Sequence, residues 1–189
     1  MNEPRRVEHQ QTDKGYVPVY TTAVVEQPWA DYKAEDHATW GTLYQRQREL
    51  LVGRASDEFL QAQDEMGMSP HAIPRFDQLN EVLGAATGWT LIGVEGLLPE
   101  LDFFDHLANR RFPVTWWIRR PDQIDYIAEP DLFHDLFGHV PLLMNPVFAD
   151  YMEAYGKGGV KAHGIGPDAL QHLTRLYWYT VEFGLIDTK

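Results

Sequence analysis

Two histidines, His134 and His139, lie inside the otherwise apolar stretch EPDLFHDLFGHVPLL, and this stretch restricts the possible fold more than any other. Its apolar residues indicate a short buried helix with Asp131 as the N-cap. On an unbroken α-helix, residues five apart lie about 140° apart around the axis. We therefore expect the helix to end at Gly138, so that His139 can turn back toward His134.

The two histidines are candidate metal ligands, because buried imidazoles need partners and neutral imidazole is the commonest metal ligand. Two core histidines bonded to backbone groups would explain the pair about equally well. A third candidate is Glu182, which lies in the apolar and aromatic run LTRLYWYTVEFGL. A buried carboxylate needs a partner, which a metal ion would provide. Glu182 could also be a surface residue, or be paired with a cation inside the protein. Two histidines and one carboxylate are the ligand set of non-haem Fe(II) oxygenases.

Composition indicates one ordinary globular domain. The chain has 189 residues, of which 44% are hydrophobic and 23% are charged. Its first 15 residues, MNEPRRVEHQQTDKG, are polar and are expected to form a disordered arm, with a single domain over residues 16–189. The sequence contains no long apolar run, so no membrane-spanning segment is expected.

Charge and cysteine content limit the partners and the compartment. The net charge of −12 argues against a nucleic acid or an anionic membrane as a partner. The chain has no cysteine, which excludes disulfides and thiolate-held clusters and favours a cytoplasmic location. The sequence does not indicate an oligomeric state.

The predicted fold class is mainly α, with a few short β-strands and no alternating βαβ pattern. Apolar periodicity and capping residues predict the helices, and β-branched or aromatic runs predict the strands. Glycines predict a mobile loop between the last two helices. Helices are expected at 33–53, 56–67, 73–88, 99–107, 131–138, 145–155 and from 167 onward; extended segments at 16–29, 89–94, 112–118 and 124–127; and the loop at 156–166.

Three further side chains are candidates for a site. Trp178 lies four residues before Glu182, so on a helix it would border that carboxylate, although ordinary core packing explains it equally simply. Arg119 follows the apolar run VTWWI and could bind a substrate carboxylate with two hydrogen bonds, although a solvated strand end is the simpler interpretation. Asp135 could orient a ligand or be a helix-surface charge.

The two ligand-bearing stretches together resemble the iron-binding core of the pterin-dependent aromatic amino acid hydroxylases. The segments HATWGTLYQRQ, IPRFDQLN, GWTLIGVEGLLPELDFF and FPVTWWIR also resemble that catalytic domain, in the same order. The resemblance covers about residues 17–185. In its short length, the chain is similar to the bacterial phenylalanine 4-hydroxylases.

The resemblance implies an enzyme that hydroxylates L-phenylalanine to L-tyrosine with Fe(II), tetrahydrobiopterin and O2. It implies that His134, His139 and Glu182 hold the iron and carry catalysis. It implies that Arg119 and Trp178 contact the amino acid substrate, and it places an aspartate where the family usually has a glutamate near the pterin. The residues implied to contact the pterin are Gly96, Leu97, Leu98, Phe103, Asp135 and Tyr177.

Other functions stay open at this point. Tyrosine or tryptophan could be the substrate within the same family. The chain ends at Lys189, soon after Glu182, whereas family catalytic domains continue further, so an iron-binding fragment with little turnover, or an interaction module, is also possible. A zinc hydrolase is disfavoured because its helical motif has histidines four residues apart with a glutamate between them.

Overall fold

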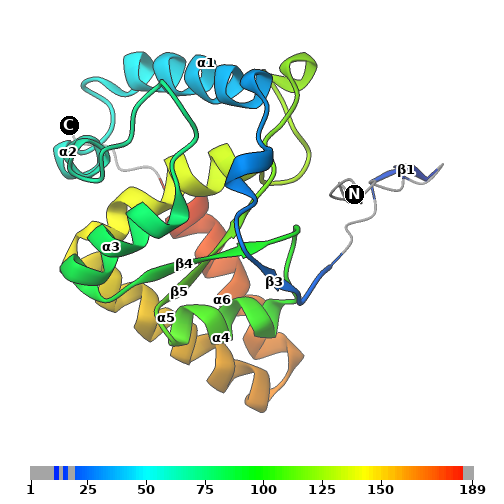
Figure 1. The fold of residues 1–189 in the computed structure, drawn as a ribbon. Coiled ribbons are helices and arrows are strands. Elements are labelled where there is room, and N and C mark those ends of the chain that lie inside the picture. The colour runs from blue at the N-terminus through cyan, green and yellow to red at the C-terminus, as the bar shows by residue number, and fades with distance from the viewer. Residues whose placement is uncertain (1–10, 13–14, 17–19, 185–189) are drawn as a thin grey trace.

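The computed structural model describes residues 11–12, 15–16 and 20–184, and it confirms the mainly helical class (Figure 1). The helices are α1 (Ala34–Leu51), α2 (Asp57–Glu65), α3 (Phe76–Thr87), α4 (Glu100–Ala108), α5 (Pro146–Ile165) and α6 (Pro167–Tyr177), with the short helices η1 (Trp29–Asp31), η2 (Pro121–Gln123), η3 (His134–His139), η4 (Val140–Met144) and η5 (Trp178–Glu182). The strands are β1 (Gln11–Thr12), β2 (Gly15–Tyr16), β3 (Val24–Val25), β4 (Thr90–Val94) and β5 (Arg111–Thr115).

A three-stranded sheet crosses the middle of the molecule in the order β3-β4-β5 (Figure 1). Strand β3 is antiparallel to β4, whereas β4 and β5 are parallel and are connected through α4. This connection forms one βαβ unit, which the sequence did not reveal. The expected strand at 124–127 was wrong, because the chain turns there after η2.

Local capping rules placed several helix ends correctly. The Ser56 hydroxyl accepts a hydrogen bond from the backbone N–H of Phe59 at the start of α2, at 3.3 Å. Gly88 ends α3 in the left-handed region, with φ of 75°, where glycine is favoured. Asn145 caps α5 by accepting from the N–H groups of Val147 and Phe148.

The predicted loop at 156–166 is wrong, because these residues belong to α5 up to Ile165. Two of its glycines, Gly156 and Gly159, lie where α5 packs against α4. A Cβ atom at Gly156 would come within 2.2 Å of the Ala108 nitrogen, and one at Gly159 within 2.1 Å of the Phe104 ring. The glycines therefore allow close helix contact, and that contact outweighs their low helix propensity.

Replacement of Gly159 by alanine is expected to destabilise the protein despite the higher helix propensity of alanine. The added methyl group would overlap the ring of Phe104, which is only 2% exposed and cannot move freely. We expect a loss of about 1 to 3 kcal/mol in the free energy of unfolding, measured by urea denaturation. Gly164→Ala is the matched control, because no atom lies within 4 Å of a Cβ there. Equal stability of the two variants would contradict the packing explanation.

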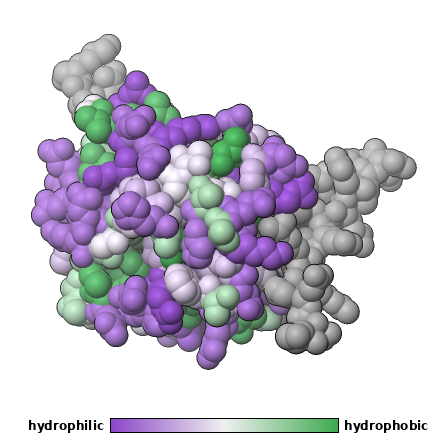
Figure 2. Space-filling model, turned by 45° about the horizontal axis from the view of Figure 1, so that its top comes forward, coloured by the Kyte–Doolittle hydropathy of each residue, from purple (hydrophilic) through white to green (hydrophobic). Residues whose placement is uncertain are grey.

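The core lies between the sheet and the surrounding helices, and Trp40, Trp89, Phe104 and Leu136 are among its buried residues. The face of the molecule in Figure 2 is mostly hydrophilic, with hydrophobic residues in small groups. Among the described residues, no helix is both long and apolar enough to cross a bilayer. Within the predicted arm, β1 pairs with β2 in an antiparallel ladder, and the rest of residues 1–15 lies outside the described residues.

Candidate metal centre

The two histidines lie on a π-helix, which explains how a spacing of five residues brings them together. The helix does not end at Gly138 as predicted; instead it widens, and η3 continues through His139. A π-helix has hydrogen bonds between residues five apart, so residues at that spacing lie about one turn apart on the same face. Asp131 caps the helix as expected, because its Oδ1 accepts from the His134 N–H at 3.0 Å.

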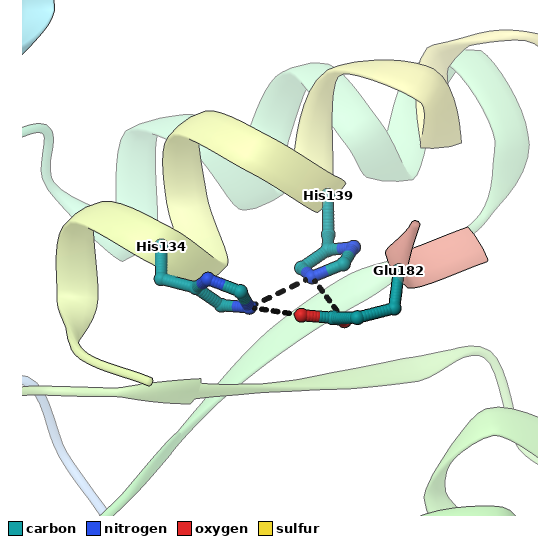
Figure 3. A group of neighbouring side chains, drawn as sticks. All are labelled: His134, His139 and Glu182. Atoms are coloured by element: carbon teal, nitrogen blue, oxygen red, sulfur yellow. Dashed lines mark hydrogen bonds and ion pairs between the residues drawn. The ribbon is translucent and has the colours of Figure 1, made fainter. Parts of the chain in front are cut away.

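Glu182 lies on a second π-helix, η5, which continues α6. The N–H of Phe183 donates to the carbonyl of Trp178 at 2.9 Å, which is again a bond between residues five apart. Figure 3 shows the carboxylate of Glu182 entering from this segment toward both imidazoles. Both ligand-bearing elements therefore use a wide turn, a feature that often occurs at functional sites.

The three side chains converge on one point. The Nε2 atoms of His134 and His139 are 3.1 Å apart, and they lie 3.1 Å and 3.2 Å from Oε1 and Oε2 of Glu182 (Figure 3). Bonds of about 2.1 Å at right angles to one ion would put neighbouring ligand atoms about 3 Å apart. The donor set and its spacing thus fit a single ion bound on one face, with other positions open. Among the described residues, these three form the one group able to hold a metal.

The charges of the three groups support each other. Burial alone would lower the pKa of His134, but the Glu182 hydrogen bond and the charge of Asp135 outweigh it and raise that pKa above its ordinary value. Burial raises the pKa of Glu182, but hydrogen bonds from His134 and His139 outweigh this and hold the pKa well below its usual range. Glu182 is therefore an ionised carboxylate, as a metal ligand must be.

Asp131 has a second role that the sequence did not reveal. Its fully buried carboxylate accepts from Nε and Nη2 of Arg119, each at 2.9 Å, and from the Arg119 backbone N–H. The same carboxylate caps the helix at His134, so it joins the predicted substrate arginine to the predicted metal ligand. One signal in the sequence could have suggested this pair. An arginine follows an apolar run there, and an N-cap aspartate lies nearby in the sequence.

Asp135 faces away from solvent, toward the end of β5. Its Oδ2 accepts from the Thr115 N–H at 2.7 Å, and burial raises its pKa above the ordinary value although the charge of His134 and the Thr115 hydrogen bond oppose the rise. The interpretation as a helix-surface charge is therefore wrong. The implied pterin contact of Asp135 stays a prediction.

The residues implied to hold the pterin form two groups. The ring of Phe103, on α4, lies 5.4 Å from that of Tyr177, and Tyr177 lies 6.3 Å from the His139 ring. Burial, followed by the charge of Glu182, raises the pKa of Tyr177 well above its ordinary value. In the loop after β4, Gly96, Leu97 and Leu98 are half-buried, and the Leu97 carbonyl accepts from the N–H of Thr21 at 2.8 Å. The rings of Phe103 and Tyr177 therefore form a continuous aromatic contact from α4 to His139.

Trp178 lies at the surface of the molecule, at the start of η5. Its ring stacks on Phe183 at 5.4 Å, and 50% of the residue is exposed. On the wide turn of η5, Trp178 and Phe183 share a face, because they are five residues apart. A substrate contact for Trp178 stays a prediction.

A cavity of about 260 Å³ opens beside His134. Its walls include Leu43 of α1, the side chain of Arg119 and the rings of Phe133 and Phe137. Arg46, which pairs with Asp125, lines it as well. The cavity thus combines arginine side chains with apolar surface next to a candidate metal ligand, which suits an amino acid with an aromatic side chain.

Comparison with known proteins decides the family. The sequence profile of the "Biopterin-dependent aromatic amino acid hydroxylase" family matches residues 10–189. The chain belongs to this family. A phenylalanine-4-hydroxylase from Chromobacterium violaceum is 65% identical over 162 residues, which are 86% of this chain and 54% of the relative. One from Ralstonia nicotianae is 65% identical over 164 residues, 87% of this chain and 52% of the relative.

Solved structures of the Chromobacterium violaceum enzyme show the same fold as this hydroxylase family member. One contains iron and phenylalanine and has a TM-score of 0.81 at 62% identity, over 87% of this chain and 59% of that chain. Another contains iron(III) and 7,8-dihydrobiopterin and has a TM-score of 0.84 at 63% identity, over 88% and 60%. The chain spans about half the length of the curated relatives it matches.

Proposed function

We propose that this hydroxylase family member is an iron-dependent phenylalanine 4-monooxygenase that converts L-phenylalanine to L-tyrosine with tetrahydrobiopterin and O2. His134, His139 and Glu182 would hold Fe(II). The observation that carries the proposal is the convergence of these three ligand atoms to within about 3 Å of one another, as one ion requires. The iron and phenylalanine bound by a relative with 62% identity support both the metal and the substrate.

When bound, Fe(II) and tetrahydrobiopterin would supply the activation of O2 needed for ring hydroxylation. The protein residues bind and orient the other groups. Phe103 and Tyr177 would contact the pterin next to His139, and the loop at 96–98 and Asp135 would complete the pterin site. The dihydrobiopterin bound by a relative with 63% identity supports a pterin site.

Arg119 would bind the substrate carboxylate. Asp131 occupies its Nε and Nη2 donors and fixes the guanidinium plane, and Nη1 remains for a ligand at the cavity wall. The apolar walls formed by Phe133 and Phe137 would then receive the phenyl ring and exclude water beside His134. Trp178 would close the substrate site from the side of η5.

The alternatives fit less well. A zinc hydrolase would need a carboxylate base facing the metal, but Asp135 is buried and bonded to the Thr115 N–H. Tyrosine or tryptophan as the substrate is disfavoured by the names of the 65% identical relatives, which are phenylalanine-4-hydroxylases. We propose a cytoplasmic location on the absence of cysteine from the chain.

We expect the purified chain to form L-tyrosine from L-phenylalanine when Fe(II), tetrahydrobiopterin and O2 are all present. The proposed iron, pterin and substrate sites would then all be filled. Chromatography of the products gives the measurement. Omission of the pterin, or replacement of Fe(II) by Zn(II), should stop the reaction. Parallel assays with L-tyrosine and L-tryptophan test the substrate. Iron binding without any product would favour the iron-binding fragment over the enzyme.

A further inference from the structure

Two side chains from outside the ligand helix hydrogen-bond backbone carbonyls on either side of His139. The Nε2 of Gln63, on α2, donates to the carbonyl of Phe137 at 3.4 Å. The Oγ1 of Thr87, at the end of α3, donates to the carbonyl of Leu143 at 2.8 Å. Gln63 is completely buried, so its amide has no access to solvent as an alternative partner.

A proline removes one regular backbone donor from each of these two carbonyls. The residue four positions after Phe137 is Pro141, which has no N–H for an α-helical bond. The residue three positions after Leu143 is Pro146, so the 3-10 pattern of η4 cannot continue to it either. A buried carbonyl without a donor costs about 1 to 3 kcal/mol, so the side-chain donors stabilise the backbone where these regular donors are missing.

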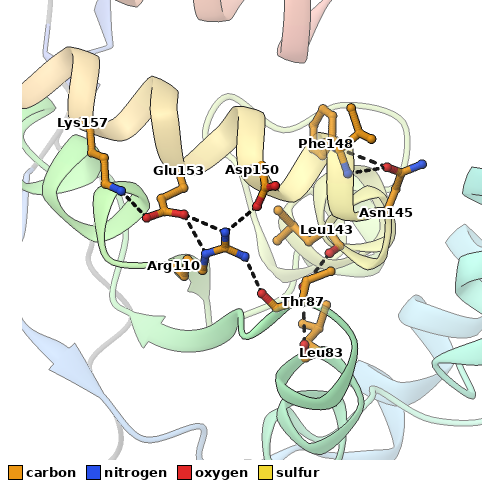
Figure 4. Close-up of polar contacts among 10 residues, drawn as sticks. Leu83, Thr87, Arg110, Leu143, Asn145, Phe148, Asp150, Glu153 and Lys157 are labelled. Carbon is orange, nitrogen blue, oxygen red and sulfur yellow. Dashed lines mark hydrogen bonds and ion pairs between the residues drawn. The ribbon is translucent and has the colours of Figure 1, made fainter.

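Both donors are themselves held in place by arginines. Nη1 of Arg48 donates to Oε1 of Gln63 at 3.0 Å. The guanidinium of Arg110 donates to the backbone carbonyl of Thr87 and pairs with Asp150 and Glu153 of α5 (Figure 4). The hydrogen bonds to η3 and η4 therefore start from fixed points on α2 and α3.

We propose that Gln63 and Thr87 are positioning residues, which hold the backbone around His139 in its wide turn and thereby aim the imidazole at the metal. This inference rests on the proposed metal site. If the segment relaxed to a regular α-helix, the two histidines would lie about 140° apart and could not share an ion. The two hydrogen bonds bracket His139 at Phe137 and Leu143, so they restrain the backbone on both sides of the ligand.

The test measures Co(II) binding by the purified full chain, with visible absorption bands as the signal. Thr87→Val removes the hydroxyl and keeps the shape, and Gln63→Met removes the amide and keeps the length. We expect each variant to bind Co(II) roughly tenfold more weakly, at the lower end of the range for outer contacts of metal ligands. The band positions at saturation should also shift, because the ligand geometry changes. Thr87→Ser, which keeps the hydroxyl, should restore both properties.

Asn80→Ala is the matched control on α3, because within the described part of the chain Asn80 makes two hydrogen bonds to the backbone of Leu91 in β4 and none to η3 or η4. It should lower the midpoint of thermal unfolding and leave Co(II) affinity and spectrum unchanged. If Thr87→Val behaves like this control, the inference is overturned while the metal site stands. If the unchanged chain does not bind Co(II), the proposed metal site fails and the inference fails with it. Should Gln63→Met not fold, the comparison of Val with Ser at Thr87 decides.

Discussion

The variant His134→Ala is expected to form no detectable L-tyrosine and to bind Fe(II) at least about a hundredfold more weakly than the unchanged chain. Removal of one ligand leaves His139 and Glu182 alone, and two ligands from separate helices form a poor site. The stability cost should be small, within about 1 kcal/mol, because the His134 side chain is 35% exposed and fills little of the core. Among the three ligands, His134 therefore separates loss of metal from loss of fold most cleanly.

The matched control for this variant is His163→Ala, on the exposed surface of α5, which should leave iron affinity and product formation unchanged. Iron affinity is measured by titration of the metal-free chain, and stability by urea denaturation. Product formation that persists in His134→Ala would reject the ligand assignment. A large fall in stability with unchanged iron affinity would show instead that His134 is a core residue.

The variant Asp131→Leu is expected to lower the free energy of unfolding by about 3 to 5 kcal/mol, because it leaves a buried cation without its partner. Asp131 is fully buried, and only 11% of the Arg119 side chain is exposed. The same change removes the N-cap of the helix that carries His134. Activity should fall further than stability alone explains, with a raised KM for phenylalanine, since the guanidinium plane would no longer be fixed.

The control for Asp131 is Asp122→Ala. Asp122 also forms a two-point pair with an arginine, Arg120, but both side chains are more than half exposed. We expect a change of less than about 1 kcal/mol there, because exposed ion pairs contribute little. Asp131→Asn, which keeps one oxygen for the His134 N–H, should lie between the two. Similar losses at Asp131 and Asp122 would mean that the buried pair has no special role in stability.

Much of the fold could be predicted from local rules. The cap at Ser56, the left-handed end at Gly88 and the strand that became β4 follow from side-chain chemistry within a few residues. The loop predicted at 156–166 failed because glycine lowers helix propensity, whereas Gly156 and Gly159 are needed for contact with α4, more than 45 residues earlier in the chain. The parallel pairing of β4 with β5 is likewise a tertiary outcome.

The metal ligands could be found from residue type and setting, but the way they meet could not. The sequence indicated that His134 and His139 needed a departure from the α-helix, and it placed that departure at Gly138. The wider turn of η3 depends on outside donors such as Gln63 and Thr87, and no local pattern names them. The Arg119 pairing with Asp131 was hidden for the same reason, since it joins two segments through a buried contact.

Histidine spacing and helix type in this centre depend on each other. A regular α-helix brings residues four apart onto one face, and the wider form does so for residues five apart. Deletion of one residue between His134 and His139 would thus permit an ordinary helix with both imidazoles still aligned, whereas the present chain has no such freedom. Because of the extra residue, both histidines can bind one metal only while this wide turn is kept. A change that converts the turn to an ordinary α-helix would therefore separate the two imidazoles.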